Sequence, residues 1–288
     1  MQIDRVNRKE LKLLAHLIDG PHTVSQLAED SGSSISWTSE RVSRLEGMGL
    51  VKKQKTGVTV RIGLTEDRLG DDLRLLMTES AYMDLSKVLA GPGLAILPLL
   101  LPPGSTMREM EDRTHISTKT IRTKLKQWQG MGLASLTVNP PRYILNESWT
   151  YLRRFLVDYV SERNLRWLRS KVPSATMIWQ WRDELLFSVG DKLEDPEFRS
   201  AGATRLEELG YDIAHAREYY LNREGNVEVS EEEALVQTLR ADPENPRGER
   251  FIRQALLDKR VDAKVLIKYA GMYGLKTRLK RLASHHGR

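Results

Sequence analysis

Two short stretches of this sequence carry hydroxyl and basic side chains at the spacing of an exposed helix face. The first runs from residue 34 to residue 44, and the second runs from residue 117 to residue 126. Serine, threonine, arginine and lysine in such an arrangement bind phosphate oxygens and the polar edges of nucleotide bases. The first face also carries Glu40, whereas the second carries no acid. The pattern therefore indicates recognition of a phosphate-rich partner, with the second stretch the stronger binder.

No part of the sequence has the spacing of a catalytic or cofactor site. There are no cysteines, and the motifs HExxH, GxxxxGK[ST], GxGxxG and GxSxG are absent. Adjacent acids occur at Asp183-Glu184, Glu207-Glu208 and residues 231–233. These positions are predicted turns and helix starts, where solvation of the acids is favoured over general acid–base chemistry. We therefore expect no enzyme activity, no cofactor and no metal site, and an enzyme within the C-terminal domain stays open as the least favoured alternative.

The residues around the first stretch are expected to form the helices that position it. Apolar spacing predicts helices over residues 8–18 and 24–30, with Thr23 as the N-cap of the second. Ser34 is the expected N-cap of a third helix. The buried stripe of that third helix is expected at Thr38, Val42 and Leu45. The hydroxyl and basic residues then remain on its outer face.

The four residues GMGL occur twice, at 47–50 and 130–133. Each copy follows a predicted helix, and glycine is the residue that most easily takes the left-handed conformation that ends helices. After the first copy the period changes to that of strands, over residues 50–55 and 58–62. After the second copy a shorter hairpin is expected. The sequence thus predicts one helix–helix–helix–hairpin unit, present twice.

The second unit is expected to repeat the first with differences. Its first helix is predicted at Leu94–Leu101 and ends at Pro102-Pro103-Gly104. Its second helix is predicted at 107–112, capped by Ser105 or Thr106. The inward positions of its third helix are expected at Ile121, Leu125 and Trp128. The outer face of that helix then holds hydroxyl and basic residues without an acid.

The segment LAEDSGSSISWTSERVSRLEGMGLVKK resembles the winged helix-turn-helix of MarR- and ArsR-type transcription regulators. The resemblance lies in the LA-E pattern, the turn glycine, the capping serine and the basic strand that follows GMGL. It implies two winged helix-turn-helix domains at residues 1–66 and 92–146, joined by a helical linker at 67–91. It also implies a sequence-specific regulator of transcription that binds double-stranded DNA.

By this resemblance, the residues expected to contact DNA come from both third helices and from the first hairpin. In the first domain they are Ser34, Ser36, Trp37, Arg41, Arg44, Lys52, Lys53 and Lys55. In the second domain they are Ser117, Thr118, Lys119, Arg122, Thr123 and Lys126.

Two alternatives remain open for these faces. Basic helix faces are often only solvated, and winged helices also serve as protein-docking modules, as in a scaffold or an antitoxin-like partner protein. Glu40 repels phosphate and so argues mildly against the first domain as the tighter reader of DNA. Trp37 is either an apolar contact at the DNA face or a packing residue against a neighbouring domain.

The rest of the chain is expected to connect, oligomerise or regulate. Residues 147–172 read as one long amphipathic helix, whose apolar stripe either forms a homodimer or belongs to an internal core. Residues 173–288 read as an α+β domain that would oligomerise or bind an effector or a protein. The fold class expected for the whole chain is mainly α, of the α+β type.

The charge is unevenly distributed along the chain. The net formal charge is +6, but residues 249–288 carry eleven Lys and Arg against three acids, and residues 146–248 carry a net −6. The basic C-terminal region is either an auxiliary phosphate-binding arm or a helix paired with the acidic block. No apolar run reaches the ~20 residues of a membrane span. Without cysteines or a secretory signal, a cytoplasmic protein is expected.

Overall fold

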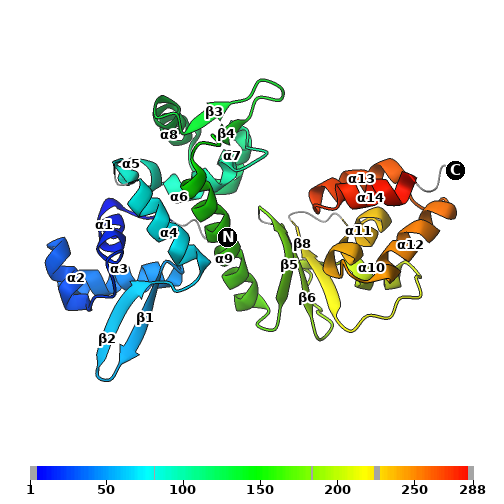
Figure 1. The fold of residues 1–288 in the computed structure, drawn as a ribbon, viewed down its shortest axis with the longest axis horizontal. Helices are drawn as coiled ribbons and strands as arrows, with labels where there is room; N and C mark the ends of the chain where they lie inside the picture. The colour runs from blue at the N-terminus through cyan, green and yellow to red at the C-terminus, as the bar shows by residue number, and fades with distance from the viewer. Residues whose placement is uncertain (1–4, 81, 183, 224–227, 285–288) are drawn as a thin grey trace. The chain divides into compact units, whose positions relative to one another are not determined.

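The computed structural model describes residues 5–80, 82–182, 184–223 and 228–284 (Figure 1). The protein is a mixed α+β fold with 54% helix, two small hairpins that follow helices, and one four-stranded antiparallel sheet. The chain divides into two compact units, residues 1–163 and residues 164–288.

The first unit opens with three helices and a hairpin, which we call the first repeat (residues 8–64). Its elements are α1 (Arg8–His16), α2 (Val24–Ser31), α3 (Ile35–Gly47), β1 (Val51–Thr56) and β2 (Thr59–Leu64). The side chains of Asn7, Thr23 and Ser34 accept hydrogen bonds from backbone N–H groups in the first turns of α1, α2 and α3. Thr38, Val42 and Leu45 are buried as expected.

The second repeat (residues 93–145) follows a short linker. Its elements are α6 (Gly93–Ile96), η1 (Leu97–Leu100), α7 (Met107–Thr114), α8 (Thr118–Gly130), β3 (Ala134–Leu136) and β4 (Tyr143–Leu145). The single helix expected at Leu94–Leu101 is wrong, because a short α-helix passes into a 3-10 turn there. Pro98 has no N–H to continue the α-helical pattern. Thr106 is the N-cap of α7, and the three expected inward residues of α8 are buried.

Gly104, just before α7, packs closely against the second hairpin. Its φ is 79°, and a Cβ atom there would lie 2.4 Å from the Tyr143 carbonyl oxygen and 2.4 Å from Ile144 Cγ2. Gly104→Ala is therefore expected to lower the free energy of unfolding through two costs. Alanine in the left-handed conformation costs ~1 kcal/mol, and the overlap of its Cβ atom with the hairpin costs a further ~1–3 kcal/mol. Urea unfolding of both proteins measures the difference.

Gly132 supplies the matched control. Its φ is 66°, but no atom lies within 4 Å of a Cβ built on it. Gly132→Ala therefore carries the backbone strain alone, ~1 kcal/mol. Equal losses from the two substitutions would contradict the close approach at Gly104.

Two linker helices and one long helix complete the first unit. They are α4 (Arg68–Glu79), α5 (Leu85–Leu89) and α9 (Thr150–Lys171), whose last turns belong to the second unit. The apolar stripe of α9 includes Leu152, Phe155, Leu156 and Tyr159, all buried in the core of the first unit. This stripe is internal core, so α9 needs no second copy to bury it. The homodimer remains a prediction for sedimentation to test.

Reciprocal ion pairs join α4 to α9. Arg154 donates to the buried carboxylate of Asp72 at 2.6 Å, and Arg68 Nε lies 3.2 Å from Asp158 Oδ2. Burial raises the pKa of Asp158, and the neighbouring Asp72 carboxyl group adds to the rise, whereas Arg68 and Arg154 oppose it. The charge on Asp72 therefore disfavours ionisation of Asp158 at the contact between these helices.

The raised pKa of Asp158 predicts a pH dependence of stability. A proton favours the folded state here, so the stabilisation is present below the ordinary value of 3.8 and is lost as pH rises through the raised pKa. In Asp158→Asn this dependence is absent. The unfolding free energy of the variant relative to wild type should therefore increase with pH over that interval. Asp71→Asn, on the exposed side of α4, is the control and should give a flatter difference.

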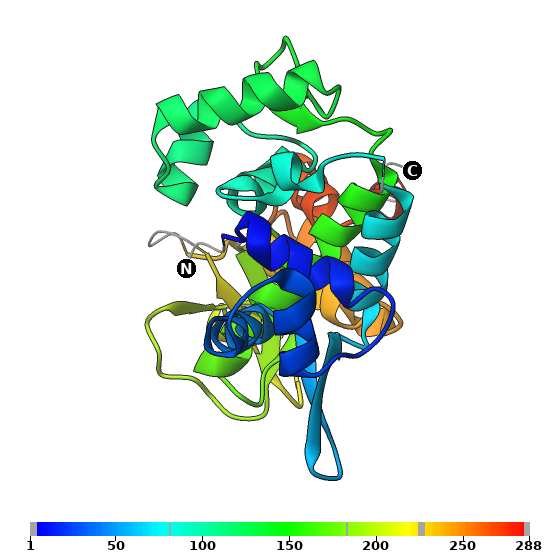
Figure 2. The same cartoon turned by 90° about the vertical axis from the view of Figure 1, so that its left-hand side faces the viewer.

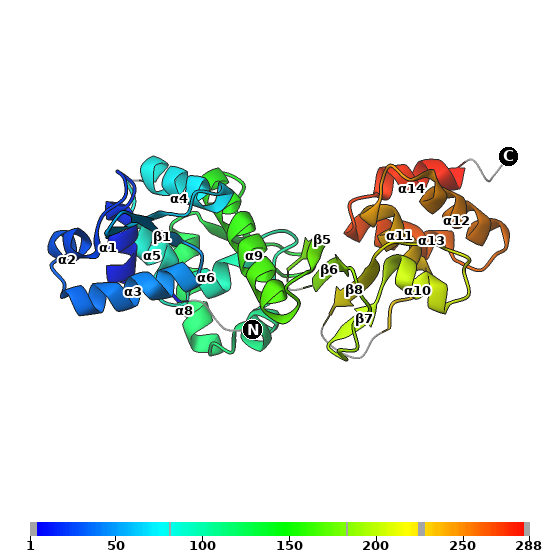
Figure 3. The same cartoon turned by 90° about the horizontal axis from the view of Figure 1, so that it is seen from below.

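The second unit holds a four-stranded sheet with helix on both of its faces (Figure 3). The helices after residue 200 share a core with one face, and Trp167 and Leu168 of α9 pack against the other. Its elements are β5 (Thr176–Trp181), β6 (Glu184–Val189), β7 (Phe198–Ser200), α10 (Gly202–Glu208), β8 (Glu218–Asn222), α11 (Glu231–Ala241), α12 (Pro246–Leu257), α13 (Ala263–Met272) and α14 (Lys276–Ser284). The strand order is β5-β6-β8-β7, with antiparallel neighbours. The strand pair that the sequence predicts at Met177–Trp181 and Leu185–Val189 is confirmed as β5 and β6. Asp183, expected in its turn, lies outside the described residues.

A buried polar network lies between this sheet and its helices. Glu233 is fully buried, and Arg223 binds both of its oxygens, at 2.6 and 3.0 Å. The Tyr273 hydroxyl donates to Glu233 at 2.7 Å and accepts from Gln237 at 2.7 Å. The Gln237 side chain in turn accepts from the backbone N–H of Gly202. The members satisfy one another, which is what a buried polar group requires.

Candidate nucleic-acid interface

The outer face of α8 carries three cations that the rest of the described chain leaves unpaired. Lys119, Arg122 and Lys126 are exposed and lie at i, i+3 and i+7 along the helix (Figure 1). None of the three forms an ion pair with an acid among the described residues, and no acid lies on α8. The face expected to bind phosphate thus keeps its positive charge free.

The hydroxyl-bearing residues of the same helix form hydrogen bonds within α8 or to Glu111. Ser117 is the N-cap of α8, and its hydroxyl lies 3.1 Å from that of Thr120. The Thr118 N–H is bound by the Glu111 side chain at 3.2 Å. The Thr123 hydroxyl donates back to the carbonyl of Lys119 at 2.9 Å. Ser117 and Thr123 are exposed, while Thr118 is half-buried.

The inner side of α8 is fixed to the linker. Lys124 Nζ and Trp128 Nε1 both donate to the carbonyl of Lys87, at 3.1 and 3.4 Å. Lys124 also lies over the Trp128 ring, 5.9 Å from its centroid. Burial lowers the pKa of Lys124, and the positive charge of Arg8 lowers it further. Lys124 therefore positions α8 against the linker instead of facing solvent.

An arginine outside the expected set anchors the second hairpin. Arg142 binds both carboxylate oxygens of Glu109, at 3.0 and 2.9 Å, and donates to the carbonyl of Gly104 at 3.0 Å. Glu109 also accepts from the N–H of Thr106 and so completes the capping box of α7. The hairpin is thereby held to the helix that precedes α8. The sequence offered no signal for this pair, since its members lie 33 residues apart.

The arginines of α3 are placed differently from those of α8. Glu10, in the first turn of α1, is fully buried, and Arg44 binds it at 2.6 Å. Arg41 lies 3.7 Å from the same oxygen and 3.2 Å from Glu40. Arg44 also donates to the carbonyl of Arg5. The structure therefore directs both arginines towards α1, although the sequence pattern placed them on the outer face.

Trp37 lies on the same side of α3. Its ring is contacted by the cations of Lys9, at 5.4 Å, and Arg41, at 5.7 Å, and it packs at the edge of the core. Both contacts lie within the first repeat, so they do not bear out packing against a neighbouring domain, and contact with DNA stays a prediction. The exposed residues of α3 include Ser36, Ser39 and Ser43, and Ser34 is its N-cap.

Two of the three lysines of the first hairpin are paired. Lys53 lies 2.8 Å from Glu46 and donates to the Ser43 hydroxyl at 2.9 Å. Lys52 lies 3.7 Å from Glu66. Lys55 is exposed, without an ion pair to a described acid. Of these three hairpin lysines, Lys55 alone keeps its charge free of a described acid.

The hairpins of the two repeats lie at opposite ends of the first unit. In Figure 2 the β1–β2 hairpin projects downwards, and the segment that holds α8 and the second hairpin lies at the top. Figure 1 shows the same separation of β1–β2 from β3–β4.

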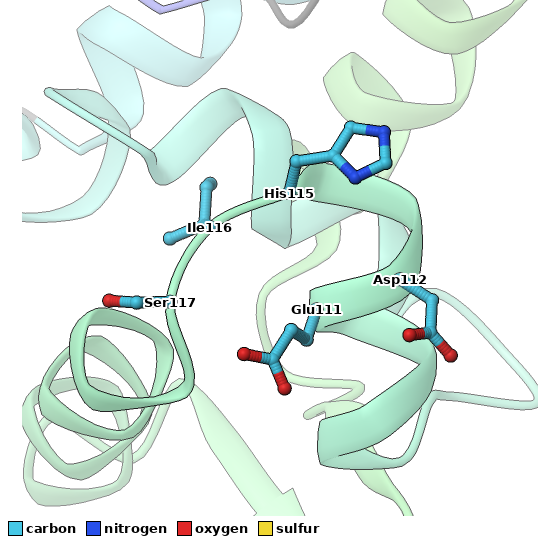
Figure 4. Close-up of a pocket in the computed structure, with 5 residues that line it drawn as sticks. All are labelled: Glu111, Asp112, His115, Ile116 and Ser117. Atoms are coloured by element: carbon cyan, nitrogen blue, oxygen red, sulfur yellow. The ribbon is translucent and has the colours of Figure 1, made fainter.

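A shallow depression borders α8 on the side of α7. It has a volume of about 440 Å³ and is lined by Glu111, Asp112, His115, Ile116 and Ser117. Figure 4 shows that the His115 ring and the two carboxylates point in different directions. The side chains do not converge on one point, and Glu111 already caps α8. The depression has the character of a surface groove beside the helix.

Three further findings bear on the chemistry of the described residues. No group of three or more His, Asp or Glu among them is arranged to hold a metal ion. No helix among them combines the length and apolar character needed to cross a membrane. Comparison with known proteins finds no protein-family model that matches this chain, and no curated protein that matches it.

Proposed function

We propose that this protein is a transcription regulator that binds double-stranded DNA through its second repeat. Both repeats have the element order of a winged helix-turn-helix, with α3 and α8 as the reading helices and the hairpins as wings. The observation that carries the proposal is the free charge on α8. Lys119, Arg122 and Lys126 remain exposed and without an ion pair to a described acid, whereas Arg44 and Lys53 of the first repeat are paired with Glu10 and Glu46.

The mechanism is electrostatic docking followed by groove reading. The cations of α8 neutralise phosphates and release counterions, and the helix enters the major groove. Exposed hydroxyls such as that of Thr123 then reach base edges or phosphates. No catalytic step is involved. Residues 173–288 would receive an effector or a partner, and a homodimer would read two-fold sites.

A second candidate function applies to the first repeat. The outer face of α3 carries Ser36, Ser39 and Ser43 together with Glu40, and Ile35 is 57% exposed at its start. A face of this kind, whose arginines are bound to Glu10, suits protein contact better than phosphate contact. In this role the first repeat is a protein-docking module, as in a scaffold or an antitoxin-like protein.

Salt dependence of binding separates the two candidates. The protein is titrated with random-sequence duplex DNA at several salt concentrations. A DNA-binding protein should show log K falling with log salt by ~0.9 per phosphate contact, so roughly 3 from the three α8 cations alone. A slope near zero would contradict the proposal and favour the docking module. Capture of genomic fragments then identifies the preferred sequence.

A further inference from the structure

We infer that the second unit carries its own phosphate-binding surface for duplex DNA, formed by lysines of α13 and α14. The residues are Lys264, Lys268, Lys276 and Lys280. The ligand assigned to this surface, duplex DNA, rests on the proposed function, but the surface is separate from α8 in both sequence and unit.

The first observation is how the two helices are docked. Leu266 and Ala270 of α13 and Leu275 and Leu279 of α14 are buried in one core cluster, which Tyr273 joins. The two helices pack against each other as well as against that core (Figure 1). Their opposite sides therefore face away from it. This also answers the question left by the sequence, because the C-terminal basic segment is a docked helix with an outer side.

The second observation is which cations lie on that outer side. Lys264 and Lys268 are exposed, four residues apart, and turned away from the buried Leu266 and Ala270. Lys276 and Lys280 form a second exposed pair, also four residues apart. Residues at this spacing are neighbours on a helix surface. Each helix thus presents a pair of adjacent positive charges.

The third observation is a difference between lysines and arginines in this part of the chain. Arg278 and Arg253 bind Glu249, at 2.8 and 3.7 Å, and Arg260 binds Glu231 at 3.0 Å. The four lysines form no ion pair with any acid in the described part of the chain. Glu249 and Glu231 are used by arginines, Asp258 accepts from Gln254, and Asp262 caps α13, so intramolecular ion pairs do not account for the lysine charge.

Like charges at this spacing disfavour a helix in the free protein, because they repel each other. A polyanion removes that cost and gains phosphate contacts, because lysine is a mobile point charge that suits a phosphate backbone without base readout. The surface therefore adds sequence-independent affinity. Because this lysine surface and α8 belong to one chain, DNA bound at one of them reaches the other in an intramolecular step, which raises the overall affinity.

The test uses the full chain and two double variants, Lys264→Gln with Lys268→Gln, and Lys276→Gln with Lys280→Gln. The control double is Lys12→Gln with Lys192→Gln, two exposed lysines that have no ion pair to a described acid and whose loss changes the net charge equally. Circular dichroism checks that every variant is folded. Affinity for random duplex DNA is then measured over a range of salt.

Each test double should lower the salt slope by up to about 1.8, at ~0.9 per lost contact, and cut affinity severalfold. The control double should change little. If both test doubles match the control, the inference is overturned. Tighter binding of duplex RNA than of DNA of the same sequence would overturn the assignment of the ligand.

A variant of α8, with Lys119, Arg122 and Lys126 changed to alanine, separates this inference from the proposed function. If the α8 variant loses slope and the test doubles do not, the proposed function stands and the second surface is refuted. If the test doubles lose slope and the α8 variant does not, the second surface stands and α8 is not the reader.

Discussion

Alanine at Lys119, Arg122 and Lys126 together is expected to weaken duplex DNA binding roughly a hundredfold, since three contacts worth ~1 kcal/mol each multiply to that factor. The salt slope should fall by about 2.7 at the same time. The physical reason is that these cations form no ion pair with a described acid and lie on one face of α8. Fluorescence titration at fixed and varied salt measures both quantities.

The matched comparison is alanine at Lys52, Lys53 and Lys55. Lys53 is held by Glu46 and Ser43, and Lys52 by Glu66, so phosphate must displace existing partners there. The loss of affinity should therefore be several times smaller than that of the α8 variant. A loss from the hairpin set equal to or larger than that from α8 would refute the assignment of α8. Gln129→Ala, at an exposed uncharged position of α8, should leave binding unchanged.

Glu233→Ala is expected to lower the free energy of unfolding of the second unit by about 3–5 kcal/mol. The substitution leaves Arg223, whose side chain is 14% exposed, without its bidentate partner. It also deprives the buried Tyr273 hydroxyl of its acceptor. Burial raises the pKa of Tyr273, and the charge of Glu233 adds to that, so the hydroxyl keeps its proton and has a donor to satisfy.

Urea unfolding followed by tryptophan fluorescence measures this loss, because Trp179 lies against the Tyr273 ring with centroids 4.3 Å apart. Glu233→Gln keeps one acceptor oxygen and should cost less than Glu233→Ala. Glu244→Ala, at an exposed position, should change stability by no more than ~0.5 kcal/mol. A Glu233→Ala loss within that margin would show that the network does not stabilise the unit.

The elements that depend on local signals were predictable from the sequence. The caps Ser34 and Thr106 and the helix end at GMGL act through residues within one turn, so their chemistry is visible in a short window. The buried stripe of α8 follows in the same way from its period. The broken first helix of the second repeat was missed because the apolar run outweighed Pro98 in the pattern.

The orientation of the α3 arginines was not predictable in this way. Their partner, Glu10, lies 34 residues from Arg44 and belongs to α1. A helical wheel assigns a residue to a face, but a long side chain bends from its face towards a buried carboxylate that the wheel does not contain. The same limit applies to Lys124, whose acceptor is the Lys87 carbonyl on a different element.

The opposite placement of the two hairpins in the first unit affects how a target sequence should be sought. Tandem reading modules suggest a search for direct repeats at fixed spacing along one straight duplex. A duplex that lies along α8 runs past the end of the unit that is remote from β1–β2. Each chain should then protect one compact footprint from nuclease cleavage. A motif search among captured fragments should therefore begin with a single short sequence instead of a direct repeat.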